Sequence, residues 1–137
     1  MILGLGSDLC PPSRWEHLLA RFGEKAARRV LAPAEADYLL GGNRQRLPER
    51  LAGRWALREA FGKALGVGLD GWSWKELRYR DGRLWAEGAL EGLLASRGVE
   101  RLHATVSHDG GVAIAVVILE GGRDTIKDAS GSAGGPR

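Results

Sequence analysis

The order of helices and strands expected along this 137-residue sequence agrees with an α+β fold, in which a mixed or antiparallel sheet is packed by long helices. Two observations support this expectation. Residues 112–119 are apolar on both faces of a strand, which favours a central position in a sheet. Residues 51–66 carry alanines at every fourth position, which favours a helix that lets another backbone approach closely.

The first half of the chain begins with an expected strand at residues 2–8. Ser13 and Glu16 have the S-x-x-E spacing of a capping box, which predicts one helix from there to about residue 31. Pro33 begins a second, short helix, because proline is favoured in the first helical turn.

The rest of the chain is expected to contain shorter elements around the alanine-rich helix. In order, these are a polar loop at 43–48, the helix end at Gly66 and Gly68, a hairpin of 74–80 and 84–86 across Asp81-Gly82, a helix at 90–96, and strands at 101–107 and 112–120 joined by 108–111.

Composition fits one domain at residues 1–120, followed by a disordered tail at residues 121–137 that is rich in Gly, Ser and Asp. The single cysteine, Cys10, excludes an internal disulfide framework; it is interpreted as a small packing residue in a reducing, cytoplasmic setting. No leader-like segment and no apolar run approaching about 18 residues is found, so no membrane association is expected. The net charge of +3 favours an acidic partner, with nucleic acid as a weaker alternative.

The alanine-rich helix also carries Glu59 and Lys63, one turn apart along the edge of its apolar face. One interpretation is an ordinary surface ion pair, which stabilises a helix by about 0.2–0.5 kcal/mol. The other is a pair placed for chemistry. Helix geometry alone does not separate the two.

The first expected helix carries a row of basic residues beside its apolar arc. Arg14, Arg21, Lys25 and Arg28 recur at steps of seven, four and three. The row has the charge of a docking face for an acidic helix, and the alternative is a solvated polar face.

Five segments in this order resemble the holo-(acyl-carrier-protein) synthase family of 4′-phosphopantetheinyl transferases. They are GLGSD at residues 4–8, Arg14, VLAPAE at 30–35, LAGRWALREAFGKALG at 51–66, and VSHD at 106–109. The central string is similar to the family pattern L-A-x-R-[FW]-x-x-K-E-A-x-x-K-A-L-G. The resemblance covers residues 1–120 with family-like spacing.

The resemblance implies transfer of 4′-phosphopantetheine from coenzyme A to a serine of apo-acyl carrier protein, with release of 3′,5′-ADP, in fatty acid biosynthesis. It assigns Mg²⁺ binding to Asp8 and Glu59, which suits an ion that takes one or two protein carboxylates. Glu59 is also expected to accept the serine proton, directly or through a metal-bound water, and Lys63 to contact the pyrophosphate. Without the resemblance, Asp8 would be interpreted as a turn or capping residue.

The family also assigns two binding surfaces. Arg44, Arg46, Arg54 and His108 are expected to hold the nucleotide end of coenzyme A, although a lone histidine in a turn is often structural. The basic row led by Arg14 is expected to bind the acidic carrier protein.

The chain has about half the length of the two-lobed transferases of this superfamily. Its short members form homotrimers with active sites between subunits, so a homotrimer of half-size α+β subunits is expected. Two other functions stay open: a carrier-binding module without catalysis, and a small basic nucleic-acid-binding domain.

Several residues depart from the family pattern. Arg58 replaces a lysine, Arg50 an aromatic residue, and Val67 a threonine. Pro11 and Pro12 replace a more helical entry to the first helix, which affects how Arg14 is presented. None of these changes removes an expected metal-binding acid.

Overall fold

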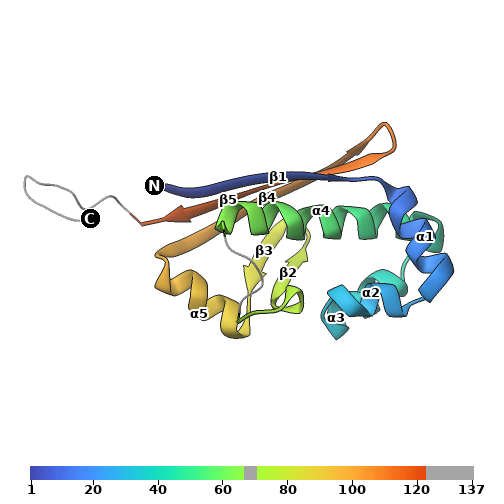
Figure 1. Cartoon of the computed structure of the whole chain (residues 1–137), viewed down its shortest axis with the longest axis horizontal. Helices are drawn as coiled ribbons and strands as arrows, with labels where there is room; N and C mark the ends of the chain where they lie inside the picture. The colour runs from blue at the N-terminus through green and yellow to red at the C-terminus, as the bar shows by residue number, and fades with distance from the viewer. Residues whose placement is uncertain (67–70, 123–137) are drawn as a thin grey trace, which may run out of the picture.

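The computed structural model describes residues 1–66 and 71–122. Figure 1 shows its elements, which follow one another as β1 (Ile2–Cys10), α1 (Pro12–Phe22), α2 (Lys25–Val30), α3 (Pro33–Leu40), the 3₁₀ turn η1 (Arg44–Arg46), α4 (Leu47–Leu65), the 3₁₀ turn η2 (Trp74–Glu76), β2 (Leu77–Arg80), β3 (Arg83–Ala86), α5 (Gly88–Ser96), β4 (Val99–Asp109) and β5 (Val112–Gly121).

A three-stranded antiparallel sheet in the order β1-β5-β4 forms one side of the molecule. Its central strand is β5, as the two-sided apolar pattern of residues 112–119 predicted. The helices lie together on one side of this sheet, with α4 running along it (Figure 1). The expected α+β fold is therefore confirmed.

The contact between β1 and α4 is a backbone-to-backbone approach. A Cβ atom added to Gly4 would lie 2.0 Å from the carbonyl oxygen of Ala64, and one added to Gly6 would lie 2.0 Å from that of Ala60. Only glycine fits at these two positions. The glycines of the GLG motif and the alanines of α4 thus form one contact, which sets the distance between strand β1 and helix α4.

The other face of the sheet is apolar and open. Leu5 and Leu9 of β1 keep 64% and 57% of their surface exposed, and Ile114 of β5 keeps 37%. Among the described residues, no helix or strand covers this face (Figure 1). Exposed apolar patches of this kind mark interaction surfaces.

The predicted first helix is wrong in two respects. It is interrupted at Gly23, whose φ of +64° ends α1, and the chain continues as the separate helix α2. Pro11 occupies the N-cap position of α1 without a side-chain capping bond, and Pro12 begins the helix, so Ser13 and Glu16 do not form the predicted capping box. Proline supplies the φ that the first turn needs, which takes the start of the helix ahead of the serine.

Other boundaries move by a few residues. Helix α4 begins at Leu47, four residues before the predicted start, because Pro48 is tolerated in its first turn. Strand β4 continues to Asp109, so His108 lies on the strand and not in the turn. The predicted hairpin turn is confirmed, with Asp81 and Gly82 at φ values of 51° and 79°.

Aromatic side chains join the helical elements. Trp15 of α1 contacts Trp55 of α4 edge-on, and the chain of contacts continues through Trp74 and Trp72 to Phe61. The two helical tryptophans, Trp15 and Trp55, therefore pack against other aromatic rings.

Cys10 is fully buried, which agrees with its predicted role as a small packing residue. The departure at Val67, the helix end at Gly68 and residues 123–137 of the predicted tail lie outside the described residues. No helix in the described part of the chain is both long and apolar enough to span a membrane.

Candidate active site

The close contact of β1 with α4 brings Asp8, Glu59 and Lys63 together. Asp8 alternates with Gly4 and Gly6 along β1 and so faces the helix. Lys63 donates to Asp8 Oδ1 and to the carbonyl oxygen of Ser7, at 3.0 Å in both cases. Lys63 thus bridges the helix to the strand, and its role is not confined to an ion pair along α4.

The two carboxylates influence each other. The pKa of Glu59 is raised, mainly by burial and further by the negative charge and hydrogen bonding of Asp8. The positive charges of Arg14 and Lys63 oppose this rise. Glu59 is therefore a carboxylate whose ionised form is disfavoured until a cation joins it.

One oxygen at this site lacks a hydrogen-bond partner among residues 1–66 and 71–122. Asp8 Oδ2 is buried there, and a proton on Glu59 or a bound cation would satisfy it. No group of three potential metal-binding side chains occurs in the described residues. Two carboxylates with an unsatisfied oxygen nevertheless suit Mg²⁺, which usually keeps several waters and takes substrate phosphate oxygens as further ligands.

Cys10 lies in the electrostatic range of the same two acids. Burial raises the pKa of its thiol, and the charges of Asp8 and Glu59 raise it further, while Arg14 lowers it. A thiol of this kind stays protonated at neutral pH and is a poor nucleophile.

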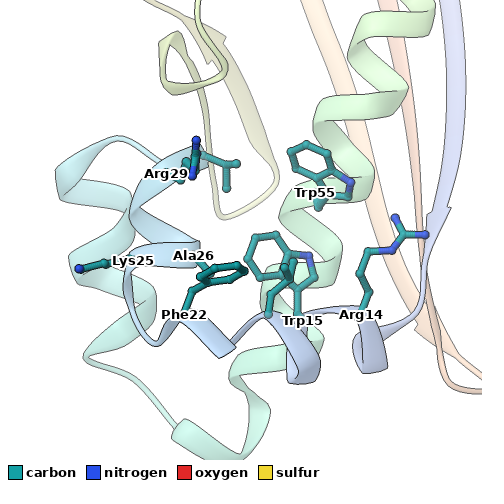
Figure 2. A pocket seen from close by; sticks show the side chains of 9 residues that line it. Arg14, Trp15, Phe22, Lys25, Ala26, Arg29 and Trp55 are labelled. Atoms are coloured by element: carbon teal, nitrogen blue, oxygen red, sulfur yellow. The ribbon is translucent and has the colours of Figure 1, made fainter. Parts of the chain in front are cut away.

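An apolar groove of about 430 Å³ adjoins the site (Figure 2). Its floor consists of aromatic and aliphatic side chains of α1, α2 and α4, with cations at its border. It is lined by Arg14, Trp15, Leu18, Phe22, Lys25, Ala26, Arg29, Val30 and Trp55. We call this surface the α1–α2 groove.

The predicted partner-binding residues do not form one continuous row. Arg14 and Lys25 border the α1–α2 groove from different helices (Figure 2). Arg21 lies over the ring of Phe22 at 5.1 Å, and Arg28 pairs with Asp37 of α3 at 2.8 Å. The interruption at Gly23 breaks the periodicity on which the predicted row depended.

Arg29 also borders the α1–α2 groove, although the sequence did not indicate it as a partner-binding residue. The face on which Arg29 lies depends on where α2 begins, at Lys25, and no local pattern predicted that start.

The predicted nucleotide-binding arginines all have protein partners. Arg44 pairs with Glu24 at 2.7 Å, and Arg46 with Glu49 at 2.8 Å. Arg54 is mostly buried, with 13% of its side chain exposed, and pairs with Glu35 at 2.8 Å. Because it is the most buried of the three, Arg54 is the least accessible to a ligand.

His108 lies at the opposite edge of the sheet from Asp8. Its Nε2 atom is 3.0 Å from the carbonyl oxygen of Glu49, near the start of α4. Strand β5 lies between β4, which carries His108, and β1, which carries Asp8, so the strands differ by two spacings or about 10 Å. Within one chain, the central strand β5 therefore separates His108 from Asp8.

Arg58, the replacement for the family lysine, is fully buried. It donates to Glu35 Oε1 at 3.0 Å and to the carbonyl oxygen of Leu77 at 2.9 Å. Burial lowers its pKa, and the negative charge of Glu35 counteracts that effect. Glu35 thus joins two arginines of α4, and through Leu77 the network ties α3 and β2 to the helix that carries Glu59.

The chain also matches a known class of transferase. The family model of the 4′-phosphopantetheinyl transferase superfamily matches residues 4–117. The chain belongs to this superfamily.

Its relatives within that class are holo-[acyl-carrier-protein] synthases. One from Anaeromyxobacter dehalogenans (strain 2CP-C) is 44% identical over 128 residues, which cover 88% of this chain and 98% of the relative. The resemblance found in the sequence motifs is confirmed.

Solved structures of such synthases have the same fold. The enzyme from Neisseria meningitidis superposes with a TM-score of 0.79 at 29% identity, over 88% of this chain and 99% of that one. The enzyme from Bacillus anthracis str. Ames, solved in complex with CoA (3′,5′-ADP), has a TM-score of 0.70 at 30% identity, over 89% and 99% of the two chains.

Proposed function

We propose that this chain transfers the 4′-phosphopantetheine group from coenzyme A to a serine hydroxyl of an apo-acyl carrier protein and releases 3′,5′-ADP. Family membership supports the reaction class, and the B. anthracis relative was solved with CoA (3′,5′-ADP). The observation that carries the proposal is the pairing of Asp8 with Glu59, with Lys63 bonded to Asp8. The reaction belongs to fatty acid biosynthesis in the cytoplasm.

Asp8 and Glu59 are the residues that would hold Mg²⁺. The unsatisfied Asp8 Oδ2 and the raised pKa of Glu59 both favour a cation at this point. Bound there, the ion would neutralise the charge of the pyrophosphate during attack of the serine oxygen.

The chain's own groups supply the remaining steps. Glu59 accepts the proton of the serine hydroxyl, directly or through a water, since general-base catalysis needs a carboxylate within hydrogen-bond reach of the nucleophile. The Lys63 ammonium, with 60% of its side chain exposed, contacts the pyrophosphate oxygens and stabilises the negative charge that develops on the leaving nucleotide. Its bond to Asp8 holds it in position.

The α1–α2 groove is the docking surface for the carrier protein. Its apolar floor and its border of Arg14, Lys25 and Arg29 complement an acidic amphipathic helix, which would place apolar side chains in the groove and carboxylates on the rim. Arg14 also lowers the pKa of Glu59 through its charge, so it lies between the docking surface and the acids.

Assembly into a homotrimer accounts for the two features that one subunit leaves incomplete. The apolar face of Leu5, Leu9 and Ile114 requires a cover, and a second copy of the sheet provides one. Asp8 and His108 lie on opposite edge strands of the sheet, so a site between subunits would join the acids of one copy with the nucleotide-binding residues of the next.

A transfer assay distinguishes this proposal from its alternatives. The purified protein is incubated with apo-acyl carrier protein, coenzyme A and Mg²⁺, and the intact mass of the carrier is measured with and without chelator. We expect a gain of one phosphopantetheine group that chelator abolishes. Carrier binding without a mass gain would indicate a module that has lost catalysis. Absence of both, with binding to nucleic acid, would indicate the basic domain.

A further inference from the structure

A charged cluster lies at one side of the open face of the sheet. Glu120 of β5 accepts a hydrogen bond from Arg101 Nε at 3.0 Å, and the same oxygen, Oε1, accepts one from His103 Nε2 at 2.8 Å. Both donors come from β4, the strand next to β5. We call these three side chains the Glu120 cluster. The proposed transfer reaction gives none of them a role.

The Glu120 cluster shares its face with the exposed apolar residues. Leu5 is paired with Ile118 across β1 and β5, and His103 is paired with Ile118 across β4 and β5. Paired residues of neighbouring strands lie on the same face, so Leu5, Ile118 and His103 form one row across the sheet. His103 lies two strand spacings, or about 10 Å, from Leu5. A molecule that covers Leu5 therefore also comes close to His103.

A second copy of the chain suits the open face better than a charged partner. Leu5 and Leu9 keep 64% and 57% of their surface exposed, and a matching apolar face would bury this area. The opposite charges of Arg101 and Glu120 neutralise each other within one chain. The Glu120 cluster therefore calls for no oppositely charged partner while His103 is neutral. Another copy of the same sheet meets both conditions.

His103 is the member of the Glu120 cluster that changes its charge near neutral pH. The bonds from Arg101 and His103 lower the pKa of Glu120 to about 2, and the bond to Glu120 raises the pKa of Arg101. Glu120 therefore stays negative and Arg101 stays positive between pH 5.5 and pH 8.0. Histidine is the side chain that gains or loses its charge in this range. The cluster is thus neutral with neutral His103 and positively charged with protonated His103.

Few other charges face His103. Among residues 1–66 and 71–122, Glu120 is the only carboxylate within 4.0 Å of it. Helices α4 and α5 lie on the other side of the sheet (Figure 1), and Arg83 of the neighbouring strand β3 lies over an aromatic ring of its own hairpin at 5.1 Å. The N-terminal ammonium group of Met1 bonds to two carbonyl oxygens just past Glu120. Asp109 shares the face of His103 but lies at the end of β4, about 20 Å away.

We propose that His103 makes self-association of this chain through the open sheet face depend on pH. With neutral His103, two copies bring their faces together without like charges, whereas protonation adds a cation to every copy on the face that becomes buried. Burial of a charge without a new partner is unfavourable, and like charges across an interface repel each other. Acidification therefore favours separated chains. The inference rests on the self-association in the proposed function, because protonation of His103 has no such cost on a face that stays open.

The test is sedimentation velocity of the full chain over a series of concentrations at pH 8.0 and pH 5.5. We expect the concentration at which half of the chains are assembled to rise about tenfold at pH 5.5. His103→Gln stays neutral and should assemble at both pH values as the wild type does at pH 8.0. His103→Lys is charged at both pH values and should assemble weakly at both. His17→Gln removes an exposed histidine from α1 and should keep the pH dependence of the wild type.

The variants separate the charge of His103 from acid damage to the fold, because an assembled His103→Gln at pH 5.5 shows that the fold tolerates acid. Equal assembly of the wild type at both pH values, stronger assembly in acid, or a pH dependence that persists in His103→Gln would overturn the inference. Failure of the proposed self-association has a different result, namely a wild type that is monomeric at both pH values and every concentration, and this would overturn the inference too. Because sedimentation needs no substrate, its result does not depend on whether the chain catalyses transfer.

Discussion

Replacement of Gly6 by alanine tests whether close packing of β1 on α4 builds the site. The added Cβ would lie 2.0 Å from the Ala60 oxygen, whereas ordinary contact begins near 3.4 Å. Strand and helix must therefore separate by about 1.4 Å, since the obstructing atoms all belong to the backbone of Ala60 and Ala64. Such overpacking costs about 3 kcal/mol, which for a chain of this length lowers Tm by about 10 °C.

The same displacement acts on the functional groups. A separation of about 1.4 Å would lengthen the bond from Lys63 Nζ to Asp8 Oδ1 from 3.0 Å to as much as about 4.4 Å. Asp8 would move away from Glu59 by a similar distance. Because misplacement by about 1 Å can reduce a rate about 100-fold, we expect Gly6→Ala to lose at least that much transfer activity below its melting temperature.

Gly62→Ala, on the helix α4 that Gly6 contacts, is the matched control. Its added Cβ meets Trp74 at 3.7 Å, an ordinary contact, and alanine in a helix is about 0.5–1 kcal/mol more stable than glycine. Calorimetric melting and the carrier mass assay are measured for both variants. A Gly6→Ala protein that melts and reacts like the wild type would refute the packing argument.

Three further predictions concern charge and assembly. Because the pKa of Glu59 is raised in the folded protein, protonated Glu59 adds stability at low pH, and this stability is lost as the pH rises through that pKa. Glu59→Gln imitates the protonated form, so without metal it should melt above the wild type at pH 7.5 and show no transfer activity. An equal or lower Tm would contradict this. Glu35→Ala leaves the buried Arg58 without its counter-charge and should lower the free energy of unfolding in urea by about 3–5 kcal/mol. Adding Arg58→Met should recover most of that loss. A decrease below about 1 kcal/mol would argue against the network. Leu5→Glu, on the open face of the sheet, should convert the proposed trimer to monomers in light scattering and abolish transfer. A variant that assembles like the wild type would exclude this face as the interface.

The sequence predicted the parts of the fold that depend on local rules. The alanine row required a close neighbour, and the glycines of GLG are that neighbour. The two-sided apolar pattern of β5 predicted its central place, and Asp81-Gly82 predicted the hairpin. Each of these signals lies within a few residues and reflects sterics or burial.

What the sequence did not predict depends on partners far apart in the chain. Arg54 and Arg58 look like accessible basic residues of a motif, yet both bond to Glu35, and no local pattern indicates that contact. The predicted row of Arg14, Arg21, Lys25 and Arg28 assumed one continuous helix. Gly23 takes a positive φ, which divides that helix and changes which cations face the α1–α2 groove. The surface that faces a partner thus depended on one backbone torsion angle.

The central claim is that Asp8 and Glu59 form one divalent-cation site on which transfer depends. Electron paramagnetic resonance with Mn²⁺, a spectroscopic substitute for Mg²⁺, measures that site in the wild type, Asp8→Asn, Glu59→Gln and the control Lys75→Ala, each in the presence of coenzyme A. We predict one bound ion per chain in the wild type and control, and loss of both the bound ion and transfer activity in each acid variant. Undiminished Mn²⁺ binding in Asp8→Asn and Glu59→Gln would contradict the account.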